Sequence, residues 1–284
     1  GVLPPGDVRQ CLVALSDSAK VRDLFDYRFD KGTFEGHSFG NILLTALEKI
    51  SGDFSEAVET ASDILRVRGI VVPATLDNVR LKMEWEQDSI VLHGERVIDQ
   101  GYFKKDPRRA KLSLTPEAKA NPTAIAAVEQ ADIVIIAPGD IYTSLGPSLV
   151  IDGISEALHR SPAVKIYVSN LVTKQGQTEG FTVSDHAAEI ERFTGGHFLD
   201  YVLYNKQKPS RDLAARYKAE HAFAVKIDSN NLRKANYRAI GGDYLGQVGK
   251  KNKGDTLIKS RSLIRHDADA IVKAILDVYK NHYK

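Results

Sequence analysis

The stretch 138–144, which reads PGDIYTS, combines residue types that suit the binding of a phosphate. It directly follows the apolar run 133–137. Gly139 lets the backbone approach a ligand closely, and Thr143 and Ser144 offer hydroxyl donors. A helix that begins after this turn would present free N–H groups to an anion. The stretch therefore predicts a site for a phosphate-bearing ligand; the alternative is a strand-to-helix turn with capping hydroxyls.

A second polar loop, residues 170–178, follows another apolar run in the same way and reads NLVTKQGQT. Asn170 and Thr173 can hydrogen-bond a sugar or a base, and Lys174 can reach a phosphate. Each of these side chains can equally satisfy the backbone of its own loop. If the two apolar runs form neighbouring strands, the two loops line one crevice.

The elements that would position these loops alternate between strand and helix from residue 121 onward. Apolar runs predict strands at 132–137, 164–168 and 198–204, and segments with one apolar face predict helices between them. Repeated units of this kind form a parallel sheet with helices on both faces. We therefore predict an α/β fold, Rossmann-like and doubly wound, with a mostly parallel sheet. In such folds ligands bind outside the carboxyl ends of the strands, where both polar loops fall.

Capping residues indicate where three helices of this part begin. Asn121 followed by Pro122 combines a cap with a proline at the first helical position. Ser184 with Asp185 marks a second start, and Asp267 opens the last helical segment.

The N-terminal part has a helical pattern instead. Helices are expected after Asp7, after Ser38 and from Ser55, because apolar residues recur there at helical spacing. Residues 70–98 change to an alternating pattern around a turn, which predicts a β-hairpin with one wet face. We expect a single α/β domain over 1–284 that carries this hairpin as an insertion.

Composition excludes several classes of protein. Lys and Arg number 39 against 37 Asp and Glu, so a formal net charge of +2 gives no reason to expect nucleic acid or an anionic membrane as partner. No apolar run approaches the roughly 18 residues that cross a bilayer. The single cysteine, Cys11, makes no internal disulfide and is predicted as a core thiol. We expect a cytoplasmic protein without membrane insertion, and a homo-oligomer remains open.

Motifs along nearly the whole chain, in order, resemble the bacterial gluconeogenesis factor family, relatives of 2-phospho-L-lactate transferase (CofD-like). They are LPPGDVRQCLVAL (3–15), GHSFGN (36–41), VPAT (72–75), PGDIYTS (138–144), QGQT with SDH (175–178 and 184–186) and RHD (265–267).

The resemblance implies a Rossmann-type nucleotide-binding fold and a cytoplasmic factor needed for growth and normal cell shape on gluconeogenic carbon sources. It also implies a nucleotide or nucleotide-sugar ligand, with UDP-N-acetylglucosamine favoured. The related transferase moves a phospholactyl group from a guanosine diphosphate conjugate and uses magnesium. Family members normally begin with a Gly-Gly-x-Gly phosphate loop and an Asp-Asp-Gly-Gly-Ser-Ser run; neither is in this sequence, so we expect that N-terminal segment to be absent from it.

Motif by motif, the resemblance also implies site residues. Asp7 would face a diphosphate through a magnesium ion, or else cap its helix, and Arg9 would contact the phosphate oxygens. His37 and Asn41, four residues apart, would project together into the site. No catalytic residue is assigned, and Asp7 is the proposed metal ligand. The ligand-binding set is Asp7, Arg9, His37, Asn41, Gly139, Asp140, Tyr142, Thr143, Ser144, Asn170, Thr173, Gln175, Gly176, Thr178, Tyr217 and Arg265.

Three departures from the family pattern favour binding over transferase chemistry. Asp140 stands where the family usually has serine, and its charge would repel a phosphate unless a metal or Arg9 offsets it. Gln177 replaces a usual glutamate, which removes a potential metal ligand or base, and His221 replaces a usual glycine. A dehydrogenase is disfavoured, because 241–246 (GGDYLG) is a poor match to Gly-x-Gly-x-x-Gly and follows no predicted strand.

Overall fold

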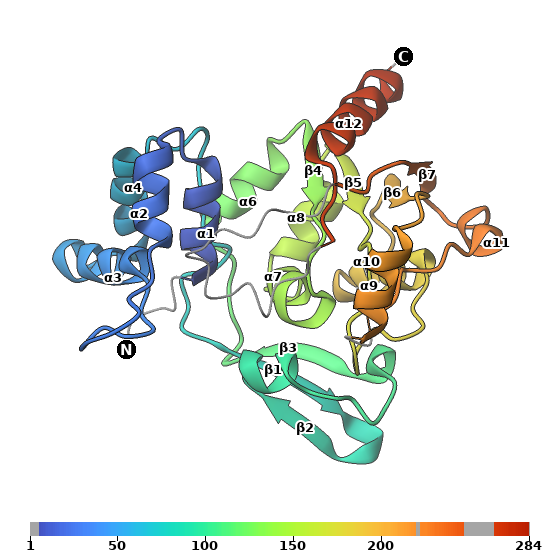
Figure 1. Cartoon of the computed structure of the whole chain (residues 1–284), viewed down its shortest axis with the longest axis horizontal. Coiled ribbons are helices and arrows are strands. Elements are labelled where there is room, and N and C mark those ends of the chain that lie inside the picture. Colours follow the sequence, from blue (N-terminus) through green and yellow to red (C-terminus); the bar gives the residue numbers. More distant parts are fainter. Residues whose placement is uncertain (1–5, 220–221, 247–263, 284) are drawn as a thin grey trace. The chain divides into compact units, whose positions relative to one another are not determined.

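The computed structural model describes residues 6–219, 222–246 and 264–283 (Figure 1). The chain divides into two compact units, which we describe separately. Within the described residues, unit 1 comprises 6–78 and 121–124, and unit 2 comprises the rest. The prediction of one domain over 1–284 stays a prediction.

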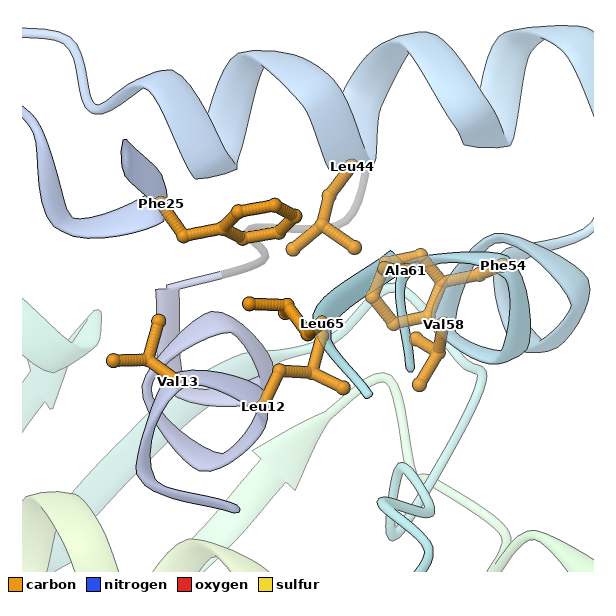
Figure 2. Close-up of a cluster of buried hydrophobic side chains, with 8 residues drawn as sticks. All are labelled: Leu12, Val13, Phe25, Leu44, Phe54, Val58, Ala61 and Leu65. Atoms are coloured by element: carbon orange, nitrogen blue, oxygen red, sulfur yellow. The ribbon is translucent and has the colours of Figure 1, made fainter. Parts of the chain in front are cut away.

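Unit 1 is helical, as the apolar spacing predicts. It contains α1 (Gly6–Leu15), α2 (Ala19–Asp26), α3 (Phe39–Ser51) and α4 (Phe54–Leu65). Their inward faces meet in one apolar cluster (Figure 2), formed by Leu12, Val13, Phe25, Leu44, Phe54, Val58, Ala61 and Leu65.

Some details of unit 1 differ from expectation. Ser38 caps α3 as predicted, but α4 starts earlier than Ser55, because the Asp53 side chain accepts a hydrogen bond from the Glu56 N–H and so caps the helix. α2 was not predicted from the sequence. Cys11 is exposed rather than in the core, because it lies outside the buried face of α1, which Arg9, Leu12 and Val13 form.

Unit 2 is built on a parallel sheet, which confirms the α/β class. Among the described residues its strand order is β4 (Ile133–Ile136), β5 (Val164–Val168), β6 (Tyr201–Asn205) and β7 (Arg238–Gly242), and every neighbouring pair is parallel. β7 is a strand that sequence analysis missed. The sequence was judged to have no strand before 241–246, yet Gly241 and Gly242 pair with Tyr204 and Asn205 inside the sheet.

Both faces of this sheet are covered. Alternate residues of β5, among them Val164 and Ile166, pack against α12 (Ala268–His282) in one apolar cluster. Tyr167 points to the opposite face and is fully buried, so that face is covered as well. α6 (Pro122–Glu129) begins in unit 1 at 122–124 and continues in unit 2. Further helices of unit 2 are α7 (Gly146–Leu149), α8 (Ile154–Arg160), α9 (Val183–Phe193), α10 (Arg211–Ala219) and α11 (Ser229–Leu232).

The helix starts in unit 2 follow capping chemistry. Asp267 caps α12 as predicted. The cap of α9 is Thr182 rather than Ser184, because Thr182 and Asp185 form a reciprocal capping box. Among the described helices, none combines the length and the apolar character that a membrane span requires.

The predicted hairpin exists and is part of a larger sheet. β1 (Arg80–Trp85) and β2 (Ile90–His93) pair antiparallel around the short helix η1 (Glu86–Asp88). β3 (Lys111–Thr115) pairs with the other edge of β1. α5 (Glu95–Asp99) and η2 (Pro107–Arg109) connect β2 to β3.

Candidate functional site

The loop after β4 runs into a single π-helical turn, η3 (Ile141–Leu145), followed by the four-residue α7. The amides of Ser144 and Leu145 both donate to the Asp140 carbonyl, at 2.9 and 3.0 Å. The turn therefore satisfies these N–H groups itself instead of offering them to an anion, as a regular helix start would. Tyr142 and Thr143 point inward and are buried, whereas Ser144 is exposed.

Tyr142 fixes the turn to α9. Its hydroxyl donates to Oε2 of Glu189 at 2.9 Å, and Arg192 donates to both oxygens of the same carboxylate at 2.8 and 2.7 Å. The Tyr142 ring also lies edge-on to Phe103 and Phe193. Burial raises the pKa of Tyr142, and the neighbouring Glu189 carboxylate raises it further. Tyr142 thus positions the loop, and a ligand contact by its hydroxyl stays a prediction.

Lys174 bridges two carboxylates beside this turn. Its ammonium donates to Oδ2 of Asp140 at 2.8 Å and to Oδ1 of Asp99 at the end of α5. Thr143 donates to the same Asp99 oxygen at 3.4 Å. Burial alone would lower the pKa of Lys174, but the hydrogen bonds to Asp140 and Asp99 hold it above its ordinary value.

The bridge resolves the difficulty that Asp140 presents for an anionic ligand. Sequence analysis required a metal or Arg9 to offset this charge. The structure supplies Lys174 instead, while Arg9 pairs with Asp26 within unit 1. Asp99 lies 75 positions before Lys174, so no local pattern pointed to this pair.

Asn170 joins the two polar loops. Its Nδ2 donates to the Gly139 carbonyl at 2.9 Å, and its Oδ1 accepts from the Tyr167 hydroxyl at 3.0 Å. The ends of β4 and β5 are neighbours in the parallel sheet. The loops after them therefore lie side by side, as the sequence predicted for one crevice.

Within the second loop, two hydroxyls satisfy the backbone, which is the alternative that the sequence left open. Thr173 Oγ1 accepts from the Phe223 N–H at 3.1 Å, and Thr178 Oγ1 accepts from the Lys174 N–H at 2.8 Å. Both threonines are buried. They shape the loop, and direct contacts between these side chains and a ligand remain predictions.

The glycine of this loop meets the segment after α5. Gly176 has a positive φ of 70°, and its carbonyl accepts from the Phe103 N–H at 2.8 Å. A Cβ on Gly176 would lie 2.7 Å from the Tyr102 ring. The Gln177 amide donates to the Ile98 and Asp99 carbonyls at 2.8 and 3.0 Å. Gln175, by contrast, is exposed.

The predicted site residues of unit 1 differ in burial, and their contacts with a ligand stay predictions. Asp7 is exposed in the first turn of α1. His37 precedes the cap Ser38, so the helical spacing that should align it with Asn41 does not apply; His37 is exposed. Arg9 is buried, and neither its Nε nor the buried Oδ1 of Asn41 has a hydrogen-bond partner among the described residues.

Tyr217 and Arg265 lie in unit 2. Tyr217 packs with Leu213 and Ile264, and its hydroxyl accepts a hydrogen bond from the Ile264 N–H. This is the packing role that the sequence allowed as an alternative. The Arg265 carbonyl accepts from the Gly246 N–H at 2.8 Å, while the residue is exposed. His221 lies outside the described residues.

The described residues do not form a magnesium site by themselves. In 6–219, 222–246 and 264–283, no group of three or more His, Cys, Asp and Glu side chains is placed to hold a metal ion. Asp7 is exposed, and Asp99 and Asp140 are both paired with Lys174. Magnesium binding by Asp7 stays a prediction, and no chemical step is derived through it.

A cavity of about 180 Å³ opens at the ends of β5 and β6. Asn170 lines it together with residues that sequence analysis missed, among them Asn205, Lys206 and Lys208. The signal was present, because residues 205–208 directly follow the predicted strand 198–204 as the other polar loops follow theirs. This cavity extends the candidate site along the carboxyl edge of the sheet.

Comparisons with known proteins agree with this architecture. The family model for 2-phospho-L-lactate transferase CofD matches residues 1–245. A Bacillus subtilis protein named "Gluconeogenesis factor" is 36% identical over 280 residues, which are 98% of this chain and 83% of that protein. A Clostridium acetobutylicum protein is 38% identical over 279 residues. These residues are 98% of this chain but 59% of that protein, so the chain spans about three fifths of that relative's length.

A crystal structure of a Bacillus halodurans protein shares the fold, with a TM-score of 0.85 at 34% identity. The match covers 96% of this chain and 83% of that one. The sequence motifs, the family model and these relatives agree along almost the whole chain. The chain therefore belongs to the bacterial gluconeogenesis factor family, whose members are related to 2-phospho-L-lactate transferase CofD.

Proposed function

We propose that this chain is a cytoplasmic regulatory factor that binds a nucleotide sugar and is required for growth and cell morphogenesis under gluconeogenic conditions. The observation that carries the proposal is the hydrogen bond from Asn170 to the Gly139 carbonyl. It joins two polar loops at the carboxyl edge of a parallel sheet, where α/β folds bind their ligands. The name of the Bacillus subtilis relative supports the physiological part of the proposal.

The charges of the candidate site support binding without turnover. Asp99 and Asp140 share Lys174, and Glu189 is held by Tyr142 and Arg192. A general base needs a free lone pair within reach of a substrate proton. Glu189 is buried and has both oxygens hydrogen-bonded, and the charge of Asp99 and Asp140 is offset by Lys174, which favours a site that holds its ligand over one that transfers a group from it.

The favoured ligand is UDP-N-acetylglucosamine. Hydroxyl and amide groups of the two loops suit a sugar, and Lys174 offers a cation for a phosphate. Asp140 neutralises part of the Lys174 charge, so we expect the loops to recognise the sugar more than the phosphate charge of the ligand. A homo-oligomer remains compatible with this proposal.

A second candidate is a magnesium-dependent transferase acting on a nucleoside-diphosphate-linked substrate. The match of residues 1–245 to the CofD family model favours it. The replacement of a usual family glutamate by Gln177 disfavours it, because the Gln177 amide is a donor that bonds two carbonyls and supplies no base.

Thermal unfolding separates the two candidates. We would measure the Tm of the full chain with UDP-N-acetylglucosamine, GDP, UDP and NADP, each with magnesium and with a chelator. A ligand at about 100 times its Kd adds about 2.7 kcal/mol of stability, which is a visible shift. The proposed function predicts stabilisation by the UDP-sugar in chelator, with the sugar recovered intact by chromatography.

The opposite outcome is equally definite. Stabilisation by GDP that requires magnesium, without any response to the UDP-sugar, would reject the binding factor and establish the transferase as the working function. NADP alone raising the Tm would reject both.

A further inference from the structure

The cavity at the ends of β5 and β6 has an unusual charge. Its described lining residues include two lysines and no aspartate or glutamate. A second cavity, beside β1, is lined by three acidic and two basic residues. The full lining of the first is Asn170, Leu171, Val183, Tyr204, Asn205, Lys206, Gln207, Lys208, Pro209, Ala224, Val225, Ile227, Leu245 and Ile264.

Lys206 is held at the cavity by β7. Its N–H donates to the Gly242 carbonyl at 2.8 Å. A Cβ on Gly241 would lie 2.8 Å from Cδ of Lys206 and 2.7 Å from Cζ of Tyr204. Glycine at 241 therefore gives the Lys206 stem its path along the strand end, which explains why a strand of the sheet carries a residue that usually weakens strands.

Asn205 makes the turn that carries both lysines. Its Oδ1 accepts from the N–H groups of Gln207 and Tyr244 at 3.2 and 3.0 Å. Its Nδ2 donates to the Gln207 carbonyl at 2.7 Å. The 205–208 turn is thus tied to itself and to the segment after β7. Because these hydrogen bonds already order the turn, less conformational entropy is lost when its lysines bind a ligand.

Both lysines are available. Lys206 and Lys208 are exposed, and neither ammonium has an ion pair or hydrogen bond among the described residues. Lys174, at the same edge of the sheet, forms ion pairs with the two carboxylates of Asp99 and Asp140. The unpaired positive charge at the end of β6 therefore exceeds that at the loop after β5.

Part of the cavity lining is apolar. Leu171, Val225 and Ile227 form this part, and Ile227 is 41% exposed. Asn170 lies in the lining as well and bonds the Gly139 loop. An anionic group beside a ring matches this combination, and the cavity adjoins the two loops already described.

We propose that this cavity binds the diphosphate of the nucleotide, through Lys206 and Lys208, and covers the adjoining ring with the apolar part of its lining. Phosphate oxygens and ammonium groups form charge-assisted hydrogen bonds. This assignment rests on the proposed nucleotide-sugar binding and gives that ligand an orientation. The loops after β4 and β5 then face the sugar.

The test measures ligand affinity of the full chain by isothermal titration calorimetry with UDP, uridine and inorganic pyrophosphate. Replacing both lysines (K206A with K208A) should weaken UDP binding at least tenfold, because hydrogen bonds to charged groups are among the stronger ones. Uridine affinity should hardly change. The matched control is K234A with K273A, two exposed lysines of unit 2 outside the cavity, which should leave UDP binding intact.

A second variant tests the volume rather than the charge. Ala224 lines the cavity and is exposed, so Ala224→Trp fills space without removing either lysine. It should also weaken UDP at least tenfold. Circular dichroism melts of every variant should match the parent, because the replaced side chains are exposed.

The possible results distinguish failure of the cavity assignment from failure of the proposed nucleotide-sugar binding. UDP bound equally by the parent, by the double lysine variant and by Ala224→Trp overturns the cavity assignment and leaves nucleotide binding standing. Pyrophosphate bound through the lysines without any affinity for UDP or UDP-N-acetylglucosamine supports the anion cavity and overturns the nucleotide-sugar function. A parent chain that binds none of the probes overturns both.

Discussion

Two charged networks flank the same turn after β4, and they differ mainly in burial. Tyr142, Glu189 and Arg192 form the first, in which the Glu189 side chain is 3% exposed. Asp140, Lys174 and Asp99 form the second, with side chains 28% to 44% exposed. One turn thus sends an aromatic side chain into the protein and an acidic one to the surface.

The difference in burial assigns the first network to protein stability and the second to ligand recognition. A buried carboxylate that loses its partners keeps the full cost of desolvation, so the first network fixes where the turn lies. Exposed pairs add little to stability, so the second network can adjust its charge to a ligand at low cost. The predictions below challenge this division, from the largest effect to the smallest.

Glu189→Ala should lower the free energy of unfolding by about 3 kcal/mol, because it leaves Arg192 and the Tyr142 hydroxyl without their partner. Urea unfolding followed by circular dichroism measures this change. Glu179→Ala, which removes an exposed carboxylate near the second loop, is the matched control and should cost less than about 0.5 kcal/mol. Equal costs for the two variants would contradict a structural role of the buried network.

Lys174→Met should act on binding rather than on folding. Removing the ammonium leaves Asp99 and Asp140 unneutralised beside the site, so affinity for UDP-N-acetylglucosamine should fall about tenfold, or about 1.4 kcal/mol. Stability should change by less than about 1 kcal/mol, since the pairs are partly exposed. Calorimetric titration measures the affinity, and Lys174→Arg should retain most of it. Unchanged ligand affinity in Lys174→Met would show that the second network does not contribute to ligand recognition.

Tyr142→Phe removes one hydrogen bond while Glu189 keeps Arg192. The free energy of unfolding should fall by about 1 kcal/mol, well below the loss in Glu189→Ala. Tyr102→Phe, at an exposed tyrosine, serves as control. A large loss of ligand affinity would support the predicted ligand contact of the Tyr142 hydroxyl, and unchanged affinity would contradict it.

His186, one turn before Glu189 on α9, should make stability depend weakly on pH. It is fully buried; burial lowers its pKa, and the hydrogen bond from its Nδ1–H to the Thr182 carbonyl opposes this only in part. As pH falls below the ordinary value of about 6.5, the unfolded chain takes up a proton that the folded chain does not, so stability falls. His266, also with a pKa lowered by burial, acts in the same direction.

Urea unfolding at several pH values between 7 and 5 measures that slope. His186→Gln should flatten it, whereas His93→Gln, at an exposed histidine, should not. A slope that is the same in parent and His186→Gln would assign the acid sensitivity to other groups.

The sequence predicted what depends on local pattern. The strands at 133–136 and 164–168, the hairpin and the caps Ser38 and Asp267 all follow from residues that are near one another in the chain. β7 was not predicted, because glycine is uncommon in strands. The absence of a side chain at Gly241 leaves room for the side chains of Tyr204 and Lys206, and this contact exists only in the folded protein.

The candidate site was predicted less completely, for a related reason. Its position at the strand ends follows from the α/β pattern, and Asn170 does join the loops. The direction of Tyr142 depends on Glu189, 47 positions away, and the charge at Asp140 depends on Lys174, 34 positions away. Pairs of such separation have no signature in a single sequence.

Hydrogen exchange measured by mass spectrometry tests the central claim most directly. The full chain would be compared with and without UDP-N-acetylglucosamine in the presence of a chelator. The account predicts slower exchange in peptides covering 138–146, 170–178 and 204–208, with 80–93 unchanged as an internal control. Protection confined to the β1–β2 hairpin, or no protection anywhere at saturating ligand, would contradict nucleotide-sugar binding at the carboxyl edge of the parallel sheet.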